Sequence, residues 1–333
     1  MTIDQIPARR GLLALAAALC AALFLLAGCS LPQSQQSAKA NSKLLTSDQV
    51  KIAVVTHAAP GDQFWDFVRS GVDQAAKDDG VQVDYNSSPE PAQQSTLIDN
   101  AVASGANGII VSMANPDALR AAIRRAVAKG IPVVTINSGI DDWKGFGAFT
   151  HVGQSESIAG TAAGEQLSKD GARKAVCVIH EAGNIGLEQR CAAAKKAFKG
   201  SMTNLQVNGT DTNGTAASIT SKLRADKSID AVLALQGQVA TLAVQAKGAA
   251  GSKAEVATFD VDQNVLSAIL GGRLAFAIDQ QPYAQGYEGV AAMVLKLTRG
   301  ITLGGGQPIY TGPTIVDKSN AQVTLDALKG EVG

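Results

Sequence analysis

Short apolar runs alternate with segments of helical spacing along most of this 333-residue chain, and this alternation limits the folds open to it. Runs such as Lys51-Ile-Ala-Val-Val and Gly130-Ile-Pro-Val-Val-Thr-Ile are apolar throughout, which is typical of strands buried on both faces of a parallel sheet. A segment with helical periodicity follows each run. Repeated strand–helix units predict an α/β fold with doubly wound parallel sheets.

The strand–helix units form two series, and the pattern restarts after His151. The first series predicts strands at 51–56, 81–86, 108–113 and 131–136, with helices at 63–79, 91–104 and 116–129. The second predicts strands at 174–180, 203–208, 230–235, 255–259 and 274–279, with helices at 155–168, 186–199, 214–226, 238–249, 262–271 and 283–299. A last strand, within 307–316, should cross between the lobes before a short tail. The chain therefore consists of two similar α/β halves, which we call lobes.

The first 29 residues have the pattern of a bacterial export signal, in which a positively charged start precedes an apolar run at 11–26. The segment ends in Leu26-Ala-Gly-Cys29, which resembles a lipobox. We therefore expect cleavage before Cys29, lipidation of Cys29, and anchoring to the outer face of the cell membrane, in the periplasm or the cell-wall space. A short N-terminal membrane helix is the alternative. Residues 30–49 are rich in Ser, Gln, Ala and Lys and are expected to form a flexible tether.

Two cysteines follow this segment, Cys177 in an apolar strand and Cys191 on the next helix. A strand and the helix packed on it can bring two such side chains together, and an exported protein meets oxidising conditions. We therefore expect a Cys177–Cys191 disulfide, with two free buried thiols as the alternative.

Charge and motifs exclude several classes of function. The 29 basic residues balance 29 acidic ones, so no basic surface for nucleic acid is indicated. The chain has no phosphate-binding loop, nucleophile elbow, His-Glu-x-x-His or Cys-x-x-Cys motif, so we expect neither catalysis nor a cofactor. A metal site built from His57, His151 and His180 is a minor alternative. His180-Glu181 could be an acid–base pair, but neighbours on an extended strand point to opposite faces.

Polar side chains stand at the ends of the expected strands in both lobes, where ligands bind in open α/β sheets. A mixture of amides, carboxylates and hydroxyls suits a neutral ligand rich in hydroxyl groups. Each residue alone has a simpler explanation: Asp260 could cap the next helix, and Asn137 could form a turn. The candidate ligand-binding side chains of this type are His57, Asp62, Asn137, Ser138, Asn184, Arg190, Gln236, Asp260 and Gln280.

Two adjacent aromatic residues, Phe64 and Trp65, follow the first expected strand in a chain with only 4% aromatic residues. They could form an aromatic wall that contacts the C–H groups of a ligand. They could instead pack the first helix onto the sheet. Their position at the carboxyl end of a strand, with Asp260 and Gln236 expected on the other lobe, favours the wall.

These features resemble the type I periplasmic sugar-binding proteins, the ribose-binding and galactose-binding group. The resemblance covers residues 50–316. It is carried by Lys51-Ile-Ala-Val-Val with Phe64-Trp65, Gly105-Ala-Asn-Gly-Ile-Ile-Val-Ser, Gly130-Ile-Pro-Val-Val-Thr-Ile, Ala257-Thr-Phe-Asp and Ala277-Ile-Asp-Gln-Gln-Pro. The family fold implies two α/β lobes joined by three hinge strands, here near 149–153, 278–282 and 307–312. The resemblance therefore implies one lobe of residues 50–150 with 281–308 and a second lobe of residues 151–280 with 309–333.

The resemblance also implies roles for single residues. Phe64 and Trp65 match an aromatic pair that packs against sugar faces, and Asp260 matches a carboxylate that takes two ligand hydroxyls. Gln280 matches the hinge glutamine. Gln236 falls where ribose binders carry an asparagine.

Two positions depart from the family pattern. Asn137-Ser138 stand where ribose binders have Asp-Arg, which removes a carboxylate and a bidentate cation and argues against ribose itself. The arginine of the helix after Cys177 matches Arg190 only if the loop length varies, and Glu188 lies nearby. The two face nearly opposite sides of a helix, and we favour Arg190 as the residue in the cleft.

The sequence thus predicts a monomeric receptor of an ABC importer that binds a small neutral carbohydrate or polyol between two lobes and works with ABC permease subunits. A receptor of the same fold for a nucleoside, a signal molecule or a small acid is the alternative. An enzyme on an α/β scaffold is the third hypothesis.

Overall fold

The fold was examined in a computed structural model, which describes residues 44–331. The expected export signal, Cys29 and most of the expected tether lie outside the described residues. The end of the tether region contains a short 3-10 helix, η1 (Ser47–Gln49), and the backbone N–H of Leu45 donates to the carbonyl of Leu297. None of the helices within 44–331 is both long and apolar enough to cross a membrane.

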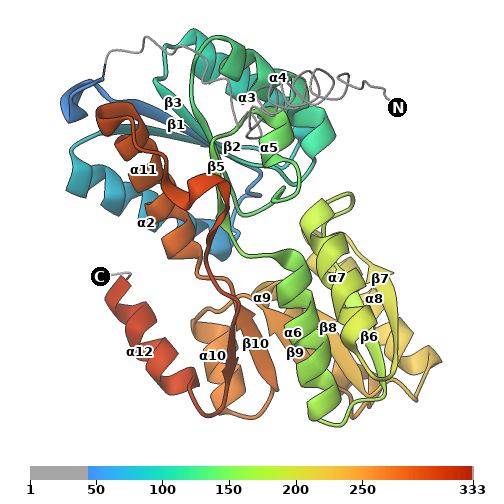
Figure 1. The fold of residues 1–333 in the computed structure, drawn as a ribbon. Helices are drawn as coiled ribbons and strands as arrows, with labels where there is room; N and C mark the ends of the chain where they lie inside the picture. Colours follow the sequence, from blue (N-terminus) through green and yellow to red (C-terminus); the bar gives the residue numbers. More distant parts are fainter. Residues whose placement is uncertain (1–43, 332–333) are drawn as a thin grey trace, which may run out of the picture. The chain divides into compact units, whose positions relative to one another are not determined.

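Two six-stranded sheets form the framework, each flanked by helices (Figure 1). In the first sheet all strands are parallel, in the order β11-β5-β4-β3-β1-β2. Its strands are β1 (Lys51–Thr56), β2 (Gln82–Ser87), β3 (Gly108–Ser112), β4 (Val133–Ile136), β5 (Thr150–Gly153) and β11 (Ile309–Tyr310). Its helices are α2 (Gln63–Asp79), α3 (Pro91–Ala103), α4 (Pro116–Ala128), α5 (Trp143–Phe146) and α11 (Pro282–Arg299).

The second sheet has the order β12-β10-β9-β8-β6-β7, and only β12 runs antiparallel to its neighbour. Its strands are β6 (Lys174–Ile179), β7 (Ser201–Gln206), β8 (Ala231–Ala234), β9 (Glu255–Phe259), β10 (Phe276–Asp279) and β12 (Thr314–Asp317). Its helices are α6 (Glu156–Lys169), α7 (Ile185–Ala197), α8 (Thr212–Ala225), α9 (Gly237–Ala250), α10 (Gln263–Leu270) and α12 (Ala321–Glu331). The predicted α/β class with two doubly wound parallel sheets is therefore confirmed.

The chain passes between the two sheets three times. It crosses after Gly153, returns between Asp279 and Pro282, and crosses again between Tyr310 and Thr314. Residues 151–153 and 309–310, which the sequence analysis assigned to the second lobe, pair within the first sheet.

Four features differ from the sequence predictions. The single strand expected within 307–316 is two strands, because Gly312 has a φ of 71° and Pro313 has no N–H to donate to a ladder. The expected tail contains a helix, α12. A one-turn helix, α5, and a 3-10 helix, η2 (Leu303–Gly306), fall in segments expected to be loops.

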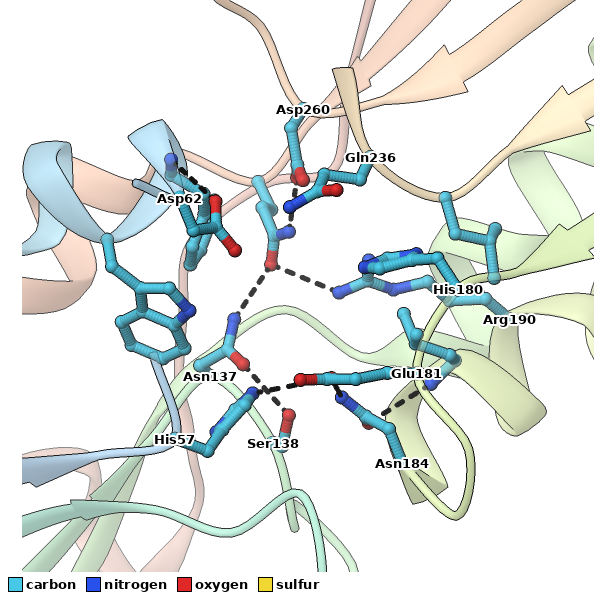
Figure 2. A pocket seen from close by; sticks show the side chains of 15 residues that line it. His57, Asp62, Asn137, Ser138, His180, Glu181, Asn184, Arg190, Gln236 and Asp260 are labelled. Atoms are coloured by element: carbon cyan, nitrogen blue, oxygen red, sulfur yellow. Dashed lines mark hydrogen bonds and ion pairs between the residues drawn. The ribbon is translucent and has the colours of Figure 1, made fainter. Parts of the chain in front are cut away.

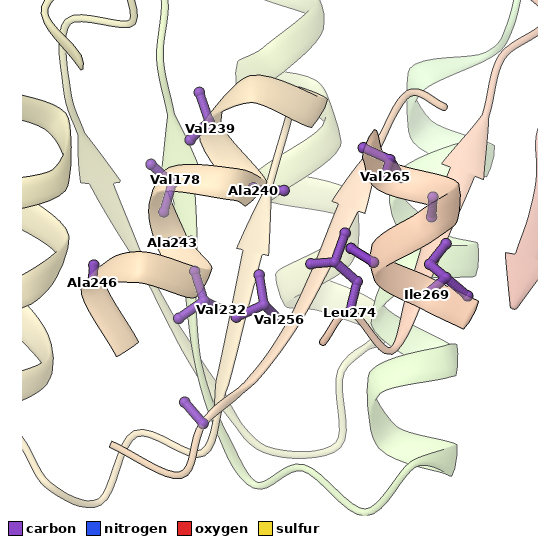
Figure 3. Packing of buried hydrophobic residues seen from close by; sticks show 14 of the residues in the cluster. Val178, Val232, Val239, Ala240, Ala243, Ala246, Val256, Val265, Ile269 and Leu274 are labelled. Carbon is purple, nitrogen blue, oxygen red and sulfur yellow. The ribbon is translucent and has the colours of Figure 1, made fainter. Parts of the chain in front are cut away.

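Apolar side chains cover both faces of each sheet. In the first lobe, one cluster joins the sheet to α2 and α11, and a second joins it to α3, α4 and α5. In the second lobe, one cluster lies under α6 and α7 and another under α8, α9, α10 and α12. Figure 3 shows part of the latter, where Val232 and Val256 of the sheet face Ala243 and Val265 of the helices. The continuous apolar strands thus have partners on both sides, as parallel sheets require.

A disulfide joins Cys177 of β6 to Cys191 of α7, with 5.9 Å between the two Cα atoms. Both residues are fully buried. The bond fixes α7 to its own sheet.

Helices α2 and α11 approach so closely that only glycine fits at their contact. A Cβ added at Gly71 would lie 2.0 Å from the carbonyl oxygen of Tyr283, and one at Gly286 would lie 2.0 Å from that of Val68. Backbone atoms on both sides leave no flexible group that could give way.

Replacing Gly71 or Gly286 by alanine should therefore destabilise the protein, because forced overpacking costs about 1–3 kcal/mol. Gly248 is the matched control, since it is exposed in α9 with open space around its Cα. Gly248→Ala should stabilise by about 0.5–1 kcal/mol through helix propensity. Urea unfolding measures all three, and a neutral Gly71→Ala would contradict the described packing.

Candidate functional site

A pocket lies where the two sheets present the carboxyl ends of their strands to each other (Figure 2). Its empty volume is about 380 Å³, which includes space open to solvent. Every side chain proposed for ligand binding from the sequence lines it. The lining residues are His57, Asp62, Phe64, Trp65, Asn137, Ser138, His180, Glu181, Asn184, Leu187, Arg190, Leu235, Gln236, Asp260 and Gln280.

The loop after β1 and the start of α2 form an aromatic wall. The rings of Phe64 and Trp65 meet edge to face at 5.1 Å, and His57 meets Trp65 in the same way at 4.8 Å. Both aromatic residues also belong to the core cluster under α2. The two interpretations of this pair are therefore compatible, because Phe64 and Trp65 pack α2 onto the sheet and also face the pocket.

Asp62 both caps α2 and faces the pocket. Its carboxylate accepts a hydrogen bond from the backbone N–H of Phe64, with an N–O distance of 3.1 Å, and another from the side chain of Gln236. Burial raises the pKa of Asp62 to about 6, against the lowering effect of these hydrogen bonds. A carboxylate held this way has oxygen lone pairs left for a hydroxyl donor.

Asp260 faces the pocket from the end of β9. Its backbone has a φ of 68°, a left-handed conformation that aspartate tolerates better than most residues. Burial raises the pKa of its carboxyl to about 7, although nearby Arg190 and a hydrogen bond from Gln280 favour the charged form. Helix α10 is capped by Asp262, whose carboxylate accepts from the N–H of Val265 at 2.7 Å, so Asp260 does not act as the cap.

Gln280, in the returning crossover segment, connects the pocket residues of both lobes. Its side-chain oxygen accepts from Asn137 at 3.2 Å and from Arg190 at 3.3 Å. Its side-chain nitrogen donates to Asp260 at 2.5 Å. Its backbone carbonyl accepts from the hydroxyl of Thr311 in the third crossover, at 2.9 Å. The side-chain amide of Gln280 thus joins three pocket groups, and its backbone joins two crossovers.

Arg190 projects from α7 and is only 4% exposed. Its Nε and Nη2 donate to the two carboxylate oxygens of Glu156, and its guanidinium stacks 4.8 Å from the ring centre of Phe259. Burial is the largest single effect and would lower the pKa of Arg190, but Glu156, Asp260 and Glu181 together raise the pKa above its usual value. Glu188 is exposed and does not line the pocket, so the structure places Arg190 there.

Three further polar residues complete the floor of the pocket. Asn137 has a φ of 62°, and its side-chain oxygen accepts from the hydroxyl of Ser138 at 2.8 Å. Asn184 caps α7 by accepting from the N–H of Gly186 at 3.0 Å, and its amide nitrogen donates to Glu181. These residues hold each other in fixed orientations, which lowers the entropy cost of binding a ligand.

The sequence analysis missed His180 and Glu181 as pocket residues. It treated them as strand neighbours that point to opposite faces, but β6 ends at Ile179 and both side chains line the pocket. Glu181 approaches the Nε2 of His57 to 4.0 Å across the pocket. Burial lowers the pKa of His57, and it lowers that of His180 to about 4, so both rings are neutral at pH 7. The position of both residues directly after a strand was the available signal.

His151 takes no part in the pocket. It is fully buried, and its Nδ1 lies 2.8 Å from the hydroxyl of Thr135. Within residues 44–331, no group of three or more His, Cys, Asp or Glu side chains could hold a metal ion.

Two hydrogen bonds join the lobes, one between backbone groups and one between side chains. The N–H of Ile185 donates to the carbonyl of Ala114 at 3.0 Å, and Gln189 donates to Asp141 at 2.8 Å.

Taken together, the lining of the pocket offers carboxylates, amides and one arginine around an aromatic wall. That arrangement suits recognition of hydroxyl groups by hydrogen bonds.

Comparison with known proteins agrees with this geometry. Residues 52–300 match the family model described as a periplasmic binding protein domain. A protein of Rhizobium meliloti named for rhizopine binding is 30% identical over 276 residues, which cover 78% of this chain and 87% of the relative. The ribose import binding protein RbsB of Haemophilus influenzae is 26% identical over 264 residues, covering 77% and 88%.

A solved structure shares both fold and sequence with this chain. The carbohydrate transporter from Acidothermus cellulolyticus, in complex with myo-inositol, superposes with a TM-score of 0.83 at 43% identity. The match covers 85% of this chain and 99% of that one. The chain therefore belongs to the periplasmic binding protein family and is a type I periplasmic sugar-binding protein.

Proposed function

We propose that this protein is the solute-binding receptor of an ABC importer and that it binds a neutral ring polyol of the myo-inositol type in the pocket of Figure 2. The observation that carries the proposal is the meeting of Asp62 and Asp260, from opposite lobes, around a small polar cavity. Its support from a relative is the 43% identical transporter protein in complex with myo-inositol.

The chemistry of the lining fits such a ligand. A ring polyol presents hydroxyl donors around its edge, and charged carboxylates accept them in hydrogen bonds about twice as strong as neutral ones. The amides of Asn137 and Gln236 can both donate and accept. The wall of Phe64 and Trp65 offers a face for the C–H groups of the ring.

Uptake needs no chemical step at this site. Ligand contacts with both lobes favour the ligand-bound arrangement over other arrangements of the lobes. In this proposal the receptor is exported, is held at the membrane by lipid on Cys29, acts as a monomer and delivers its ligand to the permease subunits of the importer.

The first test is the affinity for myo-inositol of the protein with Asp260→Asn. This change keeps the shape of the side chain and removes its charge, so we expect affinity to fall by about ten- to a hundredfold, the usual cost of a hydrogen bond to a charged group. Isothermal titration calorimetry measures it.

Asp84→Asn is the matched control, because Asp84 is exposed on β2 away from the pocket. Its affinity should equal that of the unaltered protein. If the unaltered protein is not stabilised in a thermal-shift assay by myo-inositol, related polyols, pentoses or hexoses, the carbohydrate proposal is wrong.

The second test asks whether the Trp65 ring contacts the ligand or only packs α2 onto the sheet. The chain has two tryptophans, Trp65 in the pocket and Trp143 in the core under α4 and α5. We expect ligand to change the tryptophan fluorescence, because it replaces water beside the Trp65 ring. The change should disappear in Trp65→Phe and persist in Trp143→Phe. An unchanged signal in Trp65→Phe would show that the ring does not contact the ligand.

The third test is the pH dependence of binding. Ligand hydroxyls favour the charged forms of Asp62 and Asp260, whose pKa values are raised to about 6 and about 7. Affinity should therefore rise between pH 5.5 and 8. The other ionisable groups on the pocket lining are Arg190, Glu181, His57 and His180, and Asp66 and Asp279 also act on the pair. The pKa of His180, lowered to about 4, lies below this window, and burial lowers the pKa of His57 from its ordinary value of 6.5.

The contribution of Asp62 and Asp260 to the stability of the ligand-free protein should follow the opposite trend. Because both pKa values lie above the ordinary aspartate value of 3.8, these two groups bind more protons in the folded state than in the unfolded state between about pH 4 and pH 7. Their contribution is therefore lost as pH rises through this window, while the lowered pKa values of His57, His151 and His180 act in the opposite direction. Asp260→Asn should flatten the binding profile and should remove the loss of stability due to Asp260, so identical profiles for the two proteins would contradict the assignment.

A further inference from the structure

We propose that Glu156, which lies behind the pocket and not on its lining, restricts the site to ligands without negative charge by neutralising Arg190. The inference rests on the proposed function and adds to it a residue that sets the charge class of the ligand.

Glu156 is the first residue of α6, just after the chain crosses from β5 into the second lobe. It is only 1% exposed, and both of its carboxylate oxygens accept from Arg190, with 2.9 Å between Nη2 and Oε1. The amide of Gln154 donates to the same carboxylate at 3.0 Å. The guanidinium is therefore held in a fixed two-pronged ion pair away from solvent.

Arg190 is the only lysine or arginine among the pocket-lining residues of the described chain. The other charged side chains on the lining are acidic, namely Asp62, Glu181 and Asp260. Since Glu156 balances the single cation, the pocket has no unpaired positive charge to offer an anion. A carboxylate or phosphate on the ligand would lose its hydration and meet like charges instead.

A purely structural role for Glu156 predicts a different outcome. If Glu156 only orients Arg190, its loss weakens every ligand by a similar factor. If it sets charge selectivity, its loss exposes the charge of Arg190 and changes the ratio of affinities for neutral and anionic ligands. The ratio therefore separates the two roles, while either affinity alone does not.

The experiment compares myo-inositol with quinate, a ring polyol that carries one carboxylate, by calorimetry at pH 8 and low salt. The unaltered protein should bind myo-inositol at least about a hundredfold more tightly than quinate. In Glu156→Gln that ratio should fall at least about tenfold, because glutamine keeps the shape but not the charge. Glu156→Asp should keep the ratio near that of the unaltered protein.

Glu165→Gln is the matched control, since Glu165 is exposed on the same helix. It should leave the ratio unchanged. A folded Glu156→Gln protein with an unchanged ratio overturns the proposal.

If Glu156→Gln does not fold, the unaltered protein decides: quinate binding within about tenfold of myo-inositol overturns the proposal, and a wider gap supports it. Absence of myo-inositol binding by the unaltered protein overturns the proposed function instead. An unchanged ratio beside intact myo-inositol binding counts only against the role of Glu156.

Discussion

The hydrogen bonds of one buried amide, Gln280, hold the pocket together. Gln280 stands in a segment that passes between the sheets, and its side chain binds Asn137 from the first lobe and Arg190 and Asp260 from the second. Its backbone carbonyl accepts from the hydroxyl of Thr311 in the next crossover. A buried amide whose oxygen and nitrogen both have hydrogen-bond partners is costly to disturb, because each lost partner leaves a desolvated polar atom. The relative positions of the pocket groups therefore depend on this one side chain.

Burial gives the same pocket its electrostatic character. Two carboxyls have raised pKa values, two histidines are kept neutral, and the single arginine is already paired. Such a site gains most from a ligand that brings many hydroxyl donors and no negative charge. Asn137 and Ser138 act in the same direction, since neither adds a cation to the lining and Arg190 is its one lysine or arginine.

The sequence predicted the fold and much of the pocket because continuous apolar strands end at a definite residue, and the polar residue that follows lies at the ligand edge of the sheet. The same rule failed where the end of a strand was misplaced: β6 stops at Ile179, so His180 and Glu181 belong to a loop. Glu156 could not be found this way, because it lies behind the lining and pairs with a residue 34 positions later. Helix α12 was missed because its pattern is weak, with Val323 74% exposed.

The glycine contact between α2 and α11 has a mechanical consequence. Helix α2 starts beside the aromatic wall, and α11 starts two residues after Gln280. Because Gly71 and Gly286 let the two backbones touch, the helices cannot slide past each other without a clash. We therefore expect α2 and α11 to move as one unit, so that a displacement of the aromatic wall also shifts the crossover segment that contains Gln280.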